Sequence, residues 1–170
     1  MKKKRILERK LTLVLLFSVL LLVPIVSARR KVQVTVYTVP DFGDFVQYDN
    51  SVEMPNGFID VDVGYKFFWI YDGEIIGTAY QYVTGITKVG SGNDFSALHG
   101  YGVFYSTDTV KPGTISYMLG NIYRESDNTF WGGHLKVYGG TEYFDGLKGQ
   151  GELNFEIFAF ELFLDYNPWA

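Results

Sequence analysis

The stretch FFWIYDGEIIGTAYQYVTGITK, residues 67–88, decides the fold of the chain. Asp72-Gly73 is a two-residue hairpin signal, because these residue types accept the positive φ angles that a tight turn between antiparallel strands requires. After this turn, large residues alternate with smaller ones, as expected of a β-strand. The stretch therefore predicts two antiparallel strands, Phe67–Tyr71 and Glu74–Lys88.

The same alternation recurs on both sides of this hairpin. No segment after residue 30 has a convincing helical period, and turns such as Lys111-Pro112-Gly113 separate the expected strands. Long consecutive strands joined by hairpins favour an all-β, closed, up-and-down antiparallel barrel of about eight strands over a sandwich. The irregular stretch 40–56 is expected to hold a short strand or a loop over one barrel mouth. The other expected strands are Val32–Tyr37, Ile59–Val63, Phe95–Thr107, Thr114–Glu125, Thr129–Tyr138 and Glu152–Tyr166.

Residues 1–28 are typical of a secretory signal peptide with a hydrophobic helix. Six basic residues precede the uncharged run Leu11–Val26, and the small residues after it favour cleavage behind Ala28. An uncleaved membrane anchor is the alternative, because the run approaches the roughly 17–25 residues of a spanning helix and basic residues 29–31 follow it. Both interpretations place residues 29–170, a single β domain, outside the cytoplasm: secreted, or anchored through residues 11–28.

Without residues 1–28 the chain is strongly acidic. The whole chain has 15 basic and 19 acidic residues; the leader accounts for six basic and one acidic, which leaves nine against 18, a net charge of −9. A nucleic-acid binder would need a basic face, so that class of partner is excluded. The chain has no cysteine, which excludes thiol catalysis and cysteine-ligated metal. No cofactor or metal site is expected.

The segment GGTEYFDGLKGQG, residues 139–151, precedes the last predicted strand. Its glycines permit a tight connection, and Phe144 is expected to plug one end of the barrel. The segment resembles the loop Gly-Gly-Thr-Gly-x-Phe-x-x-x-x-Gly of allene oxide cyclase-like and dirigent-like barrels. Glu142 stands where those families have a third glycine, and a positive φ there would cost roughly 1 kcal/mol. The matching positions are Gly139, Gly140, Thr141, Phe144 and Gly149.

The resemblance implies an eight-stranded barrel with an apolar cavity, frequently trimeric. It also implies an activity that cyclises a fatty-acid epoxide or steers the radical coupling of phenols. The catalytic residues of those families lie outside the matched loop, so none of them is transferred to this chain.

The last predicted strand, Glu152–Tyr166, is apolar on both faces. A barrel covers only one face of a strand, so the other face needs a partner subunit, a covering segment or lipid. We therefore expect a homo-oligomer formed through this strand.

Tyrosines on three predicted strands are candidates to bind a hydrophobic small molecule. Aromatic rings with a hydroxyl suit an apolar or phenolic ligand, although packing of core and rim tyrosines gives the same pattern. His99 lies on the same strand face as Tyr101 and Tyr105. Arg124 would attract a carboxylate ligand if its side chain pointed into the barrel, whereas an Arg124 at the solvated rim would have no such role. Tyr123 belongs to the same aromatic set. The candidates are Tyr80, Tyr82, His99, Tyr101, Tyr105, Tyr117 and Arg124.

These observations predict an exported binding or scaffold protein whose barrel holds an apolar ligand or only its own side chains. The alternative is a cyclase or isomerase that acts inside the barrel. A buried carboxylate of perturbed pKa, or an inward arginine beside an open cavity, would favour the enzyme. A third class, the outer-membrane barrel, is disfavoured by outward polar pairs such as Asp60 and Asp62, because lipid-facing residues are apolar on every strand.

Overall fold

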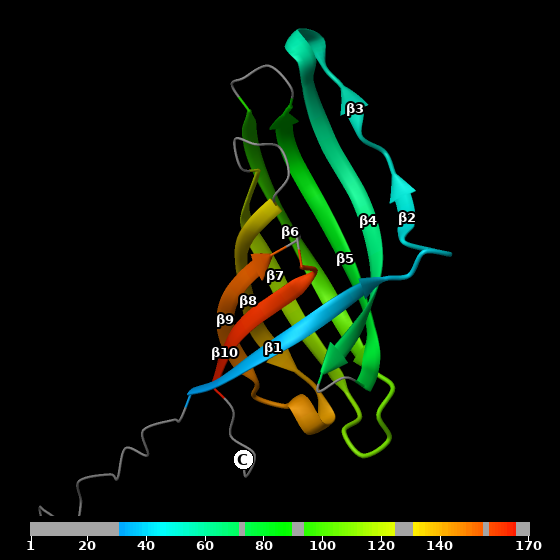
Figure 1. Cartoon of the computed structure of the whole chain (residues 1–170), viewed down its shortest axis with the longest axis vertical. Coiled ribbons are helices and arrows are strands. Elements are labelled where there is room, and N and C mark those ends of the chain that lie inside the picture. Colours follow the sequence, from blue (N-terminus) through cyan, green and yellow to red (C-terminus); the bar gives the residue numbers. More distant parts are fainter. Residues whose placement is uncertain (1–30, 72–73, 90–93, 125–130, 155–156, 166–170) are drawn as a thin grey trace, which may run out of the picture.

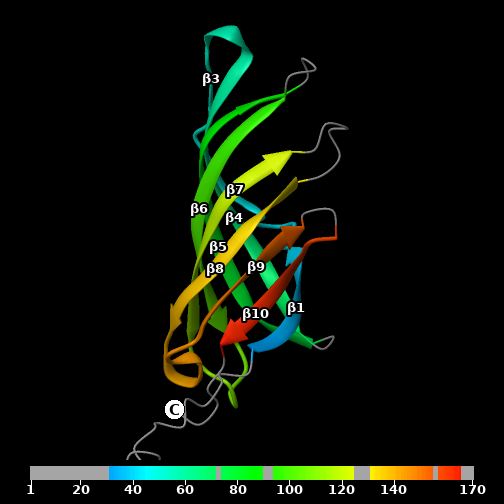
Figure 2. The same ribbon diagram turned by 90° about the vertical axis from the view of Figure 1, so that its left-hand side faces the viewer.

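A computed structural model of the chain describes residues 31–71, 74–89, 94–124, 131–154 and 157–165, in which eight antiparallel strands form a closed barrel (Figures 1 and 2). Each of these strands pairs with its neighbour in the chain, and β1 closes the barrel by pairing with both β10 and β4. The predicted closed barrel of about eight strands is confirmed, whereas the expected signal helix lies outside the described residues. The strands are β1 (Lys31–Pro40), β4 (Phe58–Tyr71), β5 (Glu74–Lys88), β6 (Phe95–Ser106), β7 (Thr114–Arg124), β8 (Trp131–Gly140), β9 (Lys148–Asn154) and β10 (Ala159–Asp165).

The stretch 40–56 contains both a loop and short strands. β2 (Val46–Asp49) and β3 (Val52–Glu53) pair with the first half of β4, beyond the part of β4 that pairs with β1. Lys66 of β4 holds this loop, because its Nζ lies 2.7 Å from Asp41 Oδ2 and 3.4 Å from Asp44 Oδ2. The hydrogen bond between the Lys66 and Asp41 side chains lowers the pKa of Asp41 below its usual range and raises the pKa of Lys66. A short 3-10 turn, η1 (Pro55–Gly57), then leads into β4.

Two predicted strand boundaries are wrong. The predicted strands Ile59–Val63 and Phe67–Tyr71 form the single strand β4, and the predicted strand Glu152–Tyr166 is divided between β9 and β10. Phe158, just before β10, has a φ of 47° that ends the alternation there. Residues 152–166 contain no glycine or proline that would signal the division between β9 and β10. Asn154, at the end of β9, is of a residue type common in turns.

Aromatic side chains fill the middle of the barrel. Trp69, Phe104, Tyr117 and Phe160, from four different strands, are between 0 and 2% exposed and form what we call the aromatic plug. The indole of Trp69 stacks on Phe104 with ring centroids 4.8 Å apart, and lies 5.2 Å from Tyr117 and 5.4 Å from Phe160. The plug therefore separates the two ends of the barrel interior.

Glycines on the inner face make room for these rings. A Cβ atom at Gly102 would lie 2.2 Å from the ring of Tyr117, and one at Gly77 would lie 2.3 Å from the ring of Phe104. Small residues on β5 and β6 are thus matched to large residues on other strands, which is how a barrel of this size reaches native packing density.

The two ends of the barrel differ. β4, β5 and β6 have 14, 15 and 12 residues, whereas β9 and β10 have seven each. The longer strands extend past the shorter ones at the top of Figure 1, and the short turn η2 (Glu142–Phe144) lies at the opposite end (Figure 2). Within the described ranges, no helix is long and apolar enough to cross a membrane.

We predict that Gly102→Ala lowers the free energy of unfolding by about 1–3 kcal/mol, because the added methyl group enters the space of the Tyr117 ring. Urea unfolding of the variant and the wild-type protein measures this change. Gly139→Ala is the control, since a Cβ there meets nothing within 4 Å, and it should change stability by less than about 0.5 kcal/mol. Equal effects of the two substitutions would contradict the packing of Tyr117 on Gly102.

Candidate functional site

Strand alternation places most of the predicted ligand-binding tyrosines on the outside of the barrel. Tyr101 and Tyr105 of β6 are 53% and 48% exposed, and each contacts a tyrosine of β5. Tyr82 stacks on Tyr101 with centroids 4.9 Å apart, and Tyr80 meets Tyr105 edge to face at 6.0 Å. Tyr117, by contrast, points inward as part of the aromatic plug. Four of these candidate tyrosines therefore share the outer face, which agrees with the alternative of rim packing given above.

Tyr117 is a neutral hydrogen-bond donor inside the barrel. Burial raises the pKa of its hydroxyl far above the usual range. This hydroxyl donates to Gln81 Oε1 at 3.4 Å, while Gln81 Nε2 has no hydrogen-bond partner. Gln81 is itself 1% exposed, so the two side chains form a small polar site within the core.

The two histidines and Arg124 lie apart from this interior. His99 is exposed on the outer face of β6, where its Nε2 lies 3.3 Å from Thr84 Oγ1, and His134 is exposed on β8. Arg124 is the last residue of β7, and its side chain is outside the described part of the structure. The described residues contain no group of three or more His, Cys, Asp or Glu side chains that could hold a metal ion.

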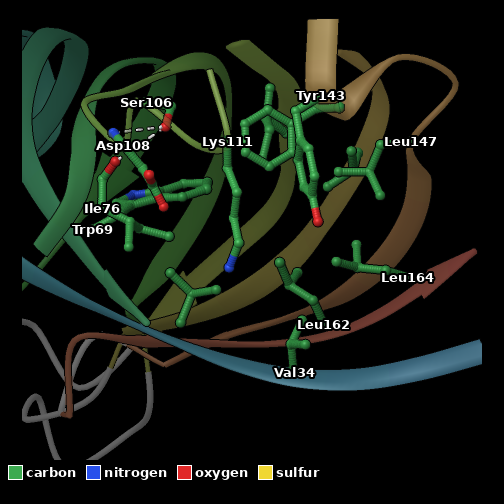
Figure 3. A pocket seen from close by; sticks show the side chains of 14 residues that line it. Val34, Trp69, Ile76, Ser106, Asp108, Lys111, Tyr143, Leu147, Leu162 and Leu164 are labelled. Carbon is green, nitrogen blue, oxygen red and sulfur yellow. Dashed lines mark hydrogen bonds between the residues drawn. The ribbon is translucent and has the colours of Figure 1, made fainter. Parts of the chain in front are cut away.

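A cavity of about 260 Å³ lies between the aromatic plug and the end of the barrel that carries η2. Figure 3 shows Trp69 at one side of this cavity and the aliphatic side chains of Leu162, Leu164 and Val34 along another. Most of the wall is apolar, as in typical small-molecule sites. We call this space the lower cavity.

Four polar side chains complete the lower cavity. Lys111 extends into it from the turn after β6, and the hydroxyl of Tyr143 points into it from η2 (Figure 3). Ser106 Oγ accepts a hydrogen bond from the Asp108 backbone N–H at 3.2 Å and donates to the Ile76 carbonyl at 3.4 Å. Asp108 Oδ1 in turn accepts from the Val110 backbone N–H at 2.8 Å. These bonds fix the turn from which Lys111 extends.

Tyr143, Phe144 and Leu147 of the segment 139–151 line this cavity. Gly139 and Gly140 end β8, and Gly149 lies in β9. The Oγ1 of Thr141 accepts a hydrogen bond from the Thr114 backbone N–H at 3.0 Å, which ties the segment to β7.

Phe144 and Glu142 shape the turn itself. The ring of Phe144 lines the lower cavity and meets Phe104 edge to face, with centroids 6.1 Å apart. Phe144 therefore packs against the core from the barrel end, as the sequence predicts. Glu142 has a φ of 54°, in the left-handed region that favours glycine.

A second, more open cavity lies at the opposite end. It has a volume of about 760 Å³ and is formed where the long strands extend past the short ones. Its wall is largely apolar and includes Val61, Val63, Leu98, Ile122 and Phe158.

Sequence reasoning missed the residues that line the lower cavity, above all Trp69, Asp108, Lys111 and Tyr143. One available signal would have found the last three. In an up-and-down barrel successive turns alternate between the two ends, so the turn 107–113 and the segment 141–147 must meet at the same end.

Comparisons of the chain with protein-family models, with curated proteins and with solved structures found no match.

We predict that Glu142→Gly raises the free energy of unfolding by about 1 kcal/mol, because glycine adopts a positive φ without the Cβ clash that glutamate has. Thermal and urea unfolding measure the change. Glu142→Ala serves as the control: it removes the charge but keeps a Cβ, and should leave stability nearly unchanged. A gain for alanine as large as that for glycine would assign the effect to the charge instead.

Proposed function

We propose that this chain is an exported barrel protein that binds a small hydrophobic molecule in the lower cavity. The observation that carries the proposal is an apolar cavity of about 260 Å³, bounded by the aromatic plug on one side and by a few converging polar groups on the other. Small-molecule sites commonly combine a largely apolar wall with a small number of polar groups that orient the ligand.

The leader supports a location outside the cytoplasm. Residues 1–28 have the basic, apolar and small-residue order of a signal peptide, with cleavage proposed after Ala28 and anchorage through residues 11–28 as the alternative. Removal of the leader gives an acidic domain, which also supports the exclusion of nucleic-acid partners.

A relation to allene oxide cyclase-like and dirigent-like barrels remains part of the proposal. It is supported by the eight-stranded closed barrel and by the positive φ of Glu142, at the position where those families have glycine. We favour binding over cyclase or isomerase activity. The buried polar side chains among the described residues are Thr38, Gln81 and Thr87, and none of these is a carboxylate that could act as a buried acid or base.

We also propose a homo-oligomer through β10, a trimer being the form that the resemblance implies. Phe163 supports this, because it lies on the outer face of β10 and is 44% exposed. Ala159, which the sequence pattern places on the same outer face, is instead buried. A contact through β10 would cover an aromatic side chain that the barrel itself leaves in water.

A charge on β10 tests the oligomer. We predict that Phe163→Asp converts the protein to monomers in sedimentation velocity, because a buried, unpaired carboxylate is incompatible with an apolar contact. Tyr101→Asp is the matched control, since Tyr101 is an exposed aromatic residue on the distant strand β6 and should leave the assembly unchanged. A monomeric wild-type protein, or an oligomer that tolerates Phe163→Asp, contradicts the assignment.

An uncharged fluorescent probe tests the cavity. We expect N-phenyl-1-naphthylamine to bind the protein exported by cells that produce the full chain, with a rise in fluorescence. Leu147→Trp should weaken binding at least about tenfold, because Leu147 is 3% exposed and lines the lower cavity, so the larger ring fills that space. The control is Val110→Trp, which adds the same ring at a position that is 79% exposed in the adjacent turn.

The two tryptophan variants separate the possible results. Retained far-UV circular dichroism and cooperative unfolding show that each variant is folded. No binding by the wild-type protein would contradict the proposal. Equal binding by wild-type protein and folded Leu147→Trp would place the probe elsewhere and would contradict it too.

A further inference from the structure

The second cavity, at the end of the barrel opposite η2, has a lining that suits a cation. We call this space the upper cavity; its volume is about 760 Å³ and its wall is largely apolar. Asp49 is the one charged side chain among the described residues that line it. We infer that the upper cavity is a second binding site, for an apolar molecule that carries an ammonium group, and that Asp49 pairs with that group. This site goes beyond the proposed function, because the aromatic plug separates it from the lower cavity.

Strand pairing places Asp49 on the inner side of the sheet. β2 pairs with the part of β4 that lies beyond β1 (Figure 1). Asp49 is paired with Val63, and residues directly opposite each other in an antiparallel pair point to the same face. Val63 is buried and lines the upper cavity, so Asp49 faces the same space. The preceding residue, Tyr48, instead stacks with Tyr82 on the outer face.

Hydrogen bonds orient the Asp49 carboxylate and keep it ionised. The Ser51 backbone N–H donates to Asp49 Oδ1 at 2.9 Å. Hydrogen bonds from the side chain and the backbone of Ser51 lower the pKa of Asp49 below its usual range. Ser51 is itself tied to β4, because its Oγ accepts from the Asp62 backbone N–H at 3.2 Å. A carboxylate has about four acceptor sites, so bonds to Ser51 leave others for an ammonium group.

Three aromatic rings of the same cavity wall add to the attraction for a cation. Phe45 stacks on Tyr65 with ring centroids 5.0 Å apart and meets Phe67 edge to face at 5.2 Å, and all three line the upper cavity. The charge of Asp49 acts on this group: burial and then that charge raise the pKa of the Tyr65 hydroxyl, which stays neutral. The faces of aromatic rings attract ammonium groups, including methylated ones. The rings and the carboxylate therefore favour the same ligand group.

The rest of the wall and the charge of the protein agree with this ligand. Val61, Leu98 and Ile122 contribute aliphatic surface that suits an alkyl chain. No described lysine or arginine lines the upper cavity, so nothing among the described side chains offers a counter-charge to an anion. Beyond the leader the chain has nine basic residues against 18 acidic ones, and a negative net charge raises the local concentration of cations.

Two ligands with the same alkyl chain test the site. Octyltrimethylammonium carries the cation, and 1-octanol has the chain without a charge. Methyl NMR titrations of the protein exported by cells that produce the full chain give both dissociation constants. We expect Asp49→Asn to weaken binding of the ammonium compound about three- to fivefold, the upper range for an exposed ion pair, while octanol binding changes little. Because each ligand is compared between proteins, the different hydrophobicities of the two compounds cancel.

Asp60→Asn is the matched control. It removes the same charge from the outer face of β4, where Asp60 is exposed, and should change the affinity for the ammonium compound by less than about 1.5-fold. Retained far-UV circular dichroism shows that both variants are folded. Equal losses in the two variants would assign the effect to the overall negative charge and overturn the inference. Octanesulfonate should bind the wild-type protein more weakly than the ammonium compound does, and equal or tighter binding of this anion would overturn it as well.

The wild-type spectra show where the ammonium compound binds. Methyl resonances of Val61 and Leu98 should shift on titration, while those of Val137 and Leu147, which line the lower cavity, should stay in place. Shifts confined to Val137 and Leu147, or no binding at all, would contradict the inference. Either result leaves the proposed function standing, because that function is tested by the fluorescent probe and Leu147→Trp in the other cavity.

Discussion

The stacking of Trp69 on Phe104 is the contact on which the interior of the barrel depends. It joins β4 to β6, and contacts of the same indole with Tyr117 and Phe160 add β7 and β10. Four strands, of which only β6 and β7 are neighbours in the sheet, are thus held by one group of rings. Because these rings fill the middle, the two cavities described above lie towards opposite ends, and each has its own shape and its own lining residues.

Much of this fold can be predicted from the sequence, because its strands alternate in residue type and its turns carry clear signals. The predicted bounds Glu74–Lys88 agree with β5, which begins after the Asp72-Gly73 signal. The division between β9 and β10 could not be predicted. Apolar residues continue through residues 152–166 in both phases, and the local change of direction depends on the positive φ of Phe158 instead of a glycine or proline.

The candidate site was harder to predict because alternation shows which residues share a face but not which face is inside. Tyr82 and Tyr101 do share a face, and it is the outer one, since the small residues Gly77 and Gly102 face inward. Inward glycines are explained only by rings on other strands, and those contacts depend on register across the closed barrel. Lys111 and Tyr143 belong to turns, so their convergence follows from topology and not from any motif.

Closure through β1 has a consequence for the order of folding. The first strand pairs with the last, and Thr38 bonds to the carbonyl of Phe158, 120 residues away in the chain. Contacts between such distant residues form slowly, because a long loop must be ordered before they can form. A chain that emerges from its N-terminus therefore keeps β1 without its β10 partner until all the other strands of the barrel have been synthesised. β1 is the first barrel strand to be synthesised, and its pairing with β10 is the last to form. A truncated chain without β10 would therefore expose β1 as an unpaired edge.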